Sequence, residues 1–289
     1  MEHKQAYNRE QAALAGVGII LVGPKYAENI GAAARIAYNF GISHLVVVRD
    51  EPPDQEAMLK MATHKAAHLI HTMELHTEVG TAVAPYHLLV GTTARKGRRR
   101  IRKHTPREVM REVAPRLAGN RIGLMFGPES SGLTNRDLDY CHLTSTIPTA
   151  DFSSLNLAQA VAIHCYELYT AAMDTTSPQL PDSEYANSHE LEGMYRHIEE
   201  VLATVGFLKH NTHVYWMRNI RQFLNRVRLQ KKESSLIRGI CRKFLWYHEN
   251  ITDSGQKEGC LTGSAPENRE GEKRPRENGP LLDKQQLSQ

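Results

Sequence analysis

From residue 17 to about residue 173, short runs of β-branched residues alternate with amphipathic stretches. This alternation is typical of an α/β domain with a largely parallel sheet. The apolar runs predict strands at 17–22, 44–48, 87–92, 121–126 and 142–147. The segments between them predict helices at 28–40, 55–72, 106–117, 135–140 and 155–173.

The chain changes character after residue 173, and the change suggests domain boundaries. Residues 174–187 are rich in Pro, Ser and Asp and predict a linker after the 17–173 domain. Residues 188–249 lack a strand pattern, and their apolar spacing predicts a small helical domain. Residues 250–289 contain few apolar side chains to offset the entropy of ordering, so we expect a disordered tail. Residues 1–16 are a polar N-terminal extension.

Composition places the chain among ordinary globular proteins. Its 289 residues are 40% hydrophobic and 24% charged, and the net charge is +4. No apolar run approaches the length that spans a bilayer, and the first residues lack a signal-peptide pattern. The four cysteines form no CxxC pair, which fits a reducing compartment. We therefore expect a cytoplasmic protein without a membrane partner.

Four segments carry candidate chemistry, and each follows the end of a predicted parallel strand, where open α/β sheets bind ligands. The first contains Asn29, Gly31 and Arg35 near the start of a helix. We expect Asn29 to cap this helix, Gly31 to allow close backbone approach, and Arg35 to project toward a ligand. The segment is neither a Walker A loop nor a Rossmann fingerprint, so ATP and NAD are disfavoured. Taken alone, a helix with an Ala-rich packing face and one Arg is more often a scaffold than a site.

The second segment runs from a strand into small residues that suit a backbone lying close to a ligand, Thr92, Thr93 and Ala94. Residues 95–103 then hold seven Lys or Arg in nine positions. A solvated charge run or a localisation patch is the alternative, but the position after a strand end favours a phosphate-contacting loop. The predicted ligands of RNA phosphates are Arg95, Lys96, Arg98, Arg99, Arg100 and Arg102.

The third and fourth segments place polar groups after two further strands. Glu129 follows a strand and is bracketed by Gly127 and Gly132. After Ile147, the residues Ser153, Ser154 and Asn156 gather at the start of a long apolar helix, whose free N–H groups can bind a carboxylate or orient a polar substrate. A tight turn with a helix cap explains the third segment alone, whereas capping explains only one serine of the fourth. Four such segments at one sheet edge predict a single site.

These segments resemble a known family. NIGAAAR, FGPESSGL and IPTADFSSLNLAQAVAI resemble, in order and spacing, the three motifs of the SpoU/TrmH group of SPOUT methyltransferases across residues 17–173. The resemblance implies a parallel-sheet α/β fold with a C-terminal trefoil knot, and a homodimer with active sites at the subunit interface. It implies S-adenosylmethionine as cofactor, contacted by Thr92, Thr93, Ala94, Gly127, Ile147, Ser153, Ser154 and Leu155.

The reaction implied by the resemblance is methyl transfer to a ribose 2′-hydroxyl of RNA. The catalytic residues would be Arg35, Asn29, Glu129, Ser154 and Asn156. A guanidinium is a poor base, so we expect Arg35 to bind the neighbouring phosphate and stabilise the developing alkoxide. The helical segment resembles the extension of TrmJ-type tRNA methyltransferases, which implies cytidine or uridine at position 32 of tRNA as the target. An rRNA target, or a non-catalytic RNA-binding protein of the same fold, remains the alternative.

A second basic cluster lies between Lys209 and Lys243, where ten Lys and Arg accompany one acid, Glu233. An ordinary solvated face of this composition would repel itself, so we expect one helix face to pack and the other to bind RNA, not DNA. The predicted RNA ligands are Arg218, Arg221 and Arg228.

A histidine group is the one candidate for a metal site. His64, His68 and His71 share a predicted helix face. No carboxylate or cysteine completes the set, and we expect no metal.

Overall fold

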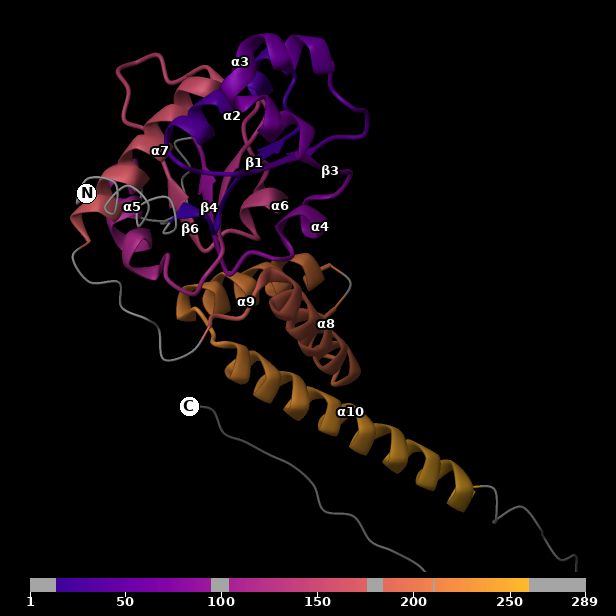
Figure 1. Cartoon of the computed structure of the whole chain (residues 1–289). Helices are drawn as coiled ribbons and strands as arrows, with labels where there is room; N and C mark the ends of the chain where they lie inside the picture. The colour runs from indigo at the N-terminus through magenta and orange to yellow at the C-terminus, as the bar shows by residue number, and fades with distance from the viewer. Residues whose placement is uncertain (1–13, 95–103, 176–183, 210, 260–289) are drawn as a thin grey trace, which may run out of the picture. The chain divides into compact units, whose positions relative to one another are not determined.

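The computed structural model describes residues 14–94, 104–175, 184–209 and 211–259, with side chains up to residue 251. One parallel sheet has the strand order β3-β2-β1-β5-β4-β6 (Figure 1). Its strands are β1 (Val17–Val22), β2 (His44–Val48), β3 (Glu74–His76), β4 (Leu88–Thr92), β5 (Ile122–Phe126) and β6 (Leu143–Ser145). The predicted α/β fold with a parallel sheet is thus confirmed.

Helices cover both faces of this sheet. One face carries α2 (Ala27–Asn39), α3 (Gln55–His71), α5 (Pro106–Val113) with the short helix η1 (Ala114–Arg116), and α7 (Leu157–Asp174). The other face carries α4 (Val79–Val83) and α6 (Asn135–Leu138). Successive strand residues point to opposite faces, so Ile19 and Leu21 enter the first core and Ile20 the second. Both sides of the strands are therefore buried, as their near-continuous apolar runs require.

Local sequence explains how the helices are placed. Asp54 caps α3 by accepting the N–H groups of Glu56 and Ala57. Gly31 of α2 faces the carbonyl of Met58 in α3, and a Cβ at this position would lie 2.1 Å from that oxygen. The close backbone approach predicted for Gly31 is confirmed, and it holds α2 against α3.

Two elements are absent from the sequence prediction. Strand β3 is three residues long and only partly buried, and α4 has five residues. Neither is long enough to show a periodic apolar pattern. The predicted segment 106–117 ends as an α-helix at Val113 and continues as η1.

The C-terminal region is helical, as predicted, with α8 (Ser188–Thr204), α9 (His213–Val227) and α10 (Lys231–Gly259). It has a core of its own, formed by Ala186, Leu191, Met194, Tyr195 and Leu229. Helix α10 continues to Gly259, into the segment predicted as a tail from residue 250. The rest of that predicted tail, 260–289, lies outside the described residues. The described residues up to Leu245 form one compact unit, and those from Trp246 a second.

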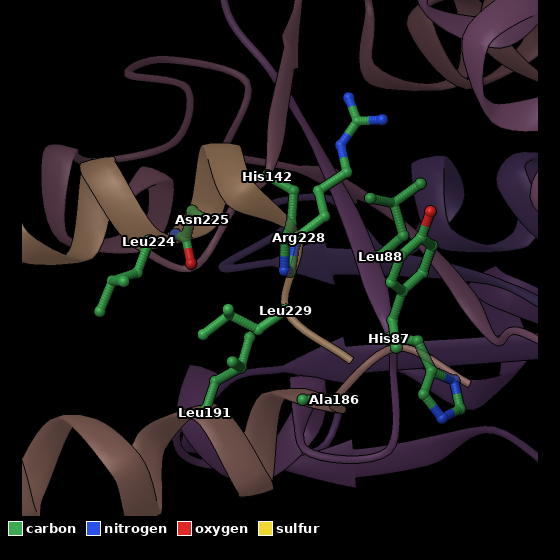
Figure 2. A pocket seen from close by; sticks show the side chains of 10 residues that line it. His87, Leu88, His142, Ala186, Leu191, Leu224, Asn225, Arg228 and Leu229 are labelled. Carbon is green, nitrogen blue, oxygen red and sulfur yellow. The ribbon is translucent and has the colours of Figure 1, made fainter. Parts of the chain in front are cut away.

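The helical region meets the sheet at the amino ends of β4 and β6. His87 and His142, the residues before these strands, line a pocket with Asn225, Arg228 and Leu229, and Figure 2 shows His142 beside Arg228. Both imidazoles accept backbone N–H groups, and burial together with Arg228 lowers the pKa of His142 to about 4. The junction leaves no space for a water molecule, so it is packed and offers no ligand cavity. Among the described helices, none has the length and apolar character to cross a bilayer.

Candidate functional site

A cavity of about 250 Å³ opens at the carboxyl ends of β4, β5 and β6. Three of the predicted segments converge on it, although they are widely separated in the sequence. All eight residues assigned to the cofactor line it: Thr92, Thr93, Ala94, Gly127, Ile147, Ser153, Ser154 and Leu155. The convergence expected from the strand-end positions is therefore present in the structure.

The first segment joins this cavity through a chain of hydrogen bonds. Asn156 is the N-cap of α7, and its side-chain oxygen accepts the N–H groups of Ala158 and Gln159. Its amide must therefore donate, and it does so to the side-chain oxygen of Asn29 at 3.0 Å. The Asn29 amide in turn donates to Glu129 Oε1 at 2.6 Å. The α7 cap thus fixes the orientation of both asparagines and directs a donor at Glu129.

Glu129 is held at the cavity as a carboxylate. Partial burial opposes ionisation, but hydrogen bonds from the Lys25 backbone N–H, at 2.9 Å, and from the Asn29 amide outweigh it. The pKa of the Glu129 carboxyl is therefore below its ordinary value. At neutral pH this group can only accept protons or hydrogen bonds, and it presents a fixed negative charge to the cavity.

One expectation about the first segment is wrong. Tyr26, not Asn29, is the N-cap residue of α2, and Asn29 lies within the first turn with its side chain turned to Glu129. Asn29 cannot cap α2 because it is the third residue of the helix, which begins at Ala27. Arg35 lies six residues after Asn29, about 9 Å further along the helix axis. It is exposed and contacts neither Glu129 nor Asn156 in the part of the subunit that the structure describes.

The closed end of the cavity contains two polar residues that sequence reasoning missed. His164 is fully buried in α7, donates from Nδ1 to the Ala160 carbonyl at 2.8 Å, and lies 2.9 Å from the Ser145 hydroxyl through Nε2. Burial lowers the pKa of His164 to about 4, so the ring is neutral and Nε2 accepts from Ser145. In the sequence His164 lies on the apolar face of its helix, and no signal marks it as part of a site.

The basic residues are arranged differently from the prediction. Arg218 pairs with Asp139 at 2.9 Å, and Arg228 pairs with Glu112. Arg221 makes a bidentate pair with Glu192 and lies 4.4 Å from the ring centre of Tyr195. All three guanidinium groups are partly buried against protein acids, so this geometry does not favour them as phosphate ligands. The predicted phosphate loop, 95–103, lies outside the described residues.

The histidines considered for a metal have other contacts. His68 bonds the Lys65 carbonyl and packs edge-on against Tyr38, and His71 lies 3.5 Å from the Gln55 amide. Within the described ranges, no group of three or more His, Cys, Asp or Glu is arranged to hold a metal ion.

Two family models of known proteins match this chain, one over the sheet domain and one over the helical region. The family model of the SpoU rRNA methylases matches residues 16–166, which contain every strand-end segment of the cavity. The chain belongs to the SpoU rRNA methylase family. The model of the C-terminal domain of the tRNA methyltransferase TrmJ matches residues 189–254, the helical region of this SpoU chain.

Individual relatives agree with the family models. The chain is similar to a tRNA (cytidine/uridine-2′-O-)-methyltransferase TrmJ from Sodalis glossinidius, at 33% identity over 78% of this chain and 90% of that protein. Among solved structures, it is similar to TrmJ from Z. mobilis ZM4, with a TM-score of 0.67 and 31% identity, covering 78% of this chain and 97% of that one. A probable methylase family protein from Haemophilus influenzae matches with a TM-score of 0.53 and 27% identity, covering 82% and 99%. The predicted SpoU/TrmH membership is confirmed.

The asparagine chain of this SpoU site gives a testable expectation. Asn156→Asp keeps the α7 cap, because Asp and Asn cap equally well, but it removes the donor to Asn29. We expect an unchanged melting temperature and a fall in methyl transfer on the order of 10-fold, since one directed hydrogen bond is lost. Asn156→Ala is the comparison, because it also removes the cap and should lower the free energy of unfolding by about 1 kcal/mol. Equal activity of wild type and Asn156→Asp would show that this hydrogen bond has no role in positioning Glu129.

Proposed function

We propose that the chain is an S-adenosylmethionine-dependent methyltransferase that acts on a ribose 2′-hydroxyl of tRNA, at cytidine or uridine of position 32. The observation that carries the proposal is the cavity at the carboxyl ends of β4, β5 and β6, with Glu129 fixed at its side in a chain of the SpoU family. The TrmJ-type helical region and the names of the similar tRNA methyltransferases support tRNA as the substrate.

The residues of the cavity fit the proposed cofactor. Phe126 and Leu157 line it with apolar surface that suits a flat adenine ring, and the hydrogen-bonded pair of His164 and Ser145 lies in the same lining. Glu129, Ser153 and Ser154 lie on more exposed backbone, where a charged amino-acid group remains solvated. When bound, the cofactor supplies a sulfonium-activated methyl group. The three convergent segments also support the predicted trefoil knot of residues 92–94, 127–132 and 147–156, which we retain as part of the proposal.

The chain's own residues would hold the ribose and stabilise the charge that forms on it. In this proposal Arg35 binds the adjacent phosphate and stabilises the 2′-oxygen as it loses its proton. Ser154 lines the cavity, and Glu129 presents an ionised acceptor beside it. Asn29 and Asn156 act as positioning residues, because both asparagine side chains lie in the hydrogen-bond chain that ends at Glu129. Correct placement of the hydroxyl supplies much of the rate.

A homodimer is part of the same proposal. Helices α2 and α7 pack side by side, and their outer surface exposes Tyr38 and Tyr166 together with Arg35. Exposed tyrosine and arginine side chains are enriched at subunit contacts. Pairing of two copies there would bring the Arg35 of one subunit near the cavity of the other. We also propose a cytoplasmic location, supported by the free thiols of Cys141 and Cys165 in the core.

The choice between tRNA, rRNA and no catalysis is tested with a radiolabelled methyl donor. We expect the purified chain to transfer tritiated methyl groups to bulk tRNA and not to rRNA. Label in rRNA alone would show that the chain is a methyltransferase whose substrate is rRNA and not tRNA. Binding of RNA without binding of S-adenosylmethionine in calorimetry would instead favour the non-catalytic alternative.

A further inference from the structure

Helix α9 directs its arginines and its aromatic residues to different surroundings. Its arginines Arg218 and Arg221 are turned inward and pair with acids. Its aromatic residues are turned outward: 56% of Tyr215, 39% of Trp216 and 56% of Phe223 are exposed. The two arginines predicted to bind RNA therefore pack against protein, whereas the aromatic side chains of α9 are open to solvent.

Phe207 extends this aromatic face. Helix α8 ends in a turn where Gly206 adopts a left-handed φ of 72° and the N–H of Phe207 bonds the Leu202 carbonyl. This turn places the Phe207 ring 5.2 Å from the ring of Trp216, which is itself 5.4 Å from that of Tyr215. Phe223 follows Trp216 by two helical turns on the same side, about 10 Å along the axis. We call Phe207, Tyr215, Trp216 and Phe223 the α9 aromatic surface.

The rings of this surface leave area free for a ligand. Phe207 and Trp216 are inclined at 56°, and Tyr215 and Trp216 at 76°, so neither pair is stacked face to face. Neighbouring rings that remain this exposed are costly to leave in water. The arrangement therefore indicates a partner with flat apolar faces.

The charged residues around the α9 aromatic surface indicate which kind of partner it binds. Helix α9 contains no acidic residue. Two cations flank its aromatic surface, Lys209 in the turn before α9 and Arg226 in its last turn, and both are exposed. Glu199 of α8 lies 2.6 Å from His213 Nε2 at the start of α9. Aromatic rings between exposed cations are the elements by which proteins bind single-stranded nucleic acid.

We propose that the α9 aromatic surface stacks on unpaired bases of the substrate RNA, with Lys209 and Arg226 contacting the flanking phosphates. This inference rests on the proposed function, since it assigns a surface to the same RNA. It predicts that the helical region binds single-stranded loops in preference to duplex, because paired bases do not present their faces.

The first test measures affinity for a fluorescein-labelled 12-nucleotide oligouridylate by anisotropy at several salt concentrations. We expect Trp216→Ala and Phe223→Ala each to weaken binding about 5- to 150-fold, the effect of removing one base–aromatic stack. The salt dependence should be unchanged by these variants, whereas Lys209→Gln with Arg226→Gln should make it less steep. Trp216→Phe keeps a ring and should retain most of the affinity. Leu75→Ala, at an exposed apolar residue on β3, is the matched control and should bind as wild type.

The second test observes stacking directly. The chain has two tryptophans, so Trp246→Phe leaves Trp216 as the one fluorescent indole. Oligouridylate should quench this emission, and a blunt RNA duplex should quench it much less. Emission unchanged at saturating oligouridylate would overturn the proposal.

The outcomes separate this inference from the proposed function. Wild-type affinity of Trp216→Ala and Phe223→Ala, in variants that still methylate tRNA, would overturn the stacking surface and leave the enzyme intact. A wild-type chain that neither binds nor methylates RNA would overturn the proposed function itself. A change of molecular mass in light scattering on Trp216→Ala, without a change in RNA affinity, would assign the surface to a contact between copies and also overturn the proposal.

Discussion

Arg35→Ala should lose methyl transfer by about 10²–10³-fold, the usual cost of removing one group that stabilises developing charge. Its affinity for S-adenosylmethionine should be unchanged, because Arg35 does not line the cavity. Stability should also be preserved, since the side chain is exposed. Single-turnover transfer of tritiated methyl groups, with calorimetric binding of the cofactor beside it, measures both quantities. Turnover equal to wild type would refute the role of Arg35.

If the proposed homodimer forms, a mixed dimer shows whether Arg35 acts on its own subunit or on the partner. Arg35→Ala leaves the cavity intact, and a variant disabled in the cavity leaves Arg35 intact. If Arg35 serves the partner's cavity, a heterodimer of the two variants contains one complete site, and co-expression should restore up to about half of the wild-type activity per heterodimer. If Arg35 serves its own subunit, both sites of the heterodimer are broken and activity stays absent.

Gly127→Ala should weaken cofactor binding. A Cβ at this position would lie 2.1 Å from the Leu133 backbone nitrogen and 2.2 Å from the Gly132 carbonyl carbon. Backbone atoms cannot rotate away as a side chain does, so the loop that forms the cavity wall must shift. We expect the free energy of unfolding to fall by on the order of 1–3 kcal/mol and the affinity for S-adenosylmethionine to fall at least about 10-fold.

Gly239→Ala is the matched control for that substitution. Gly239 lies within α10, and no heavy atom lies within 4 Å of the added Cβ. Alanine should therefore stabilise the helix by about 0.5–1 kcal/mol and leave cofactor affinity unchanged. If Gly127→Ala binds the cofactor as well as Gly239→Ala does, the 127–132 loop is not part of the cofactor site.

The order of elements and the location of the site were predictable because both depend on local pattern. Parallel strands that are buried on both faces appear in the sequence as apolar runs, and ligands bind at their carboxyl ends. The cavity residues from Thr92 to Leu155 follow from this rule together with the motifs. Strand β3 does not, because its short sequence Glu-Leu-His has no apolar run and it is placed by pairing with β2.

The function of individual charges was less predictable because their partners come from distant segments. The segment from Lys209 to Lys243 contains one acid, so its charges were expected to repel one another. The acids that pair with them lie far away in the sequence: Asp139 is 79 residues from Arg218, and Glu112 is 116 residues from Arg228. The same limit hid the pair of His164 and Ser145, which share no motif and meet only in the folded chain. The sequence shows which residues are charged, whereas the fold determines which of them pair with an opposite charge.

The most direct test of the central claim is the position of the transferred methyl group. Purified enzyme is incubated with unmodified tRNA and S-adenosylmethionine carrying a trideuterated methyl group, and the digested nucleosides are analysed by mass spectrometry. We expect the label on the ribose of cytidine or uridine, as 2′-O-methyl nucleosides that protect the adjacent phosphodiester from alkali. Label on a base, or no label with cofactor and tRNA both bound, would contradict it.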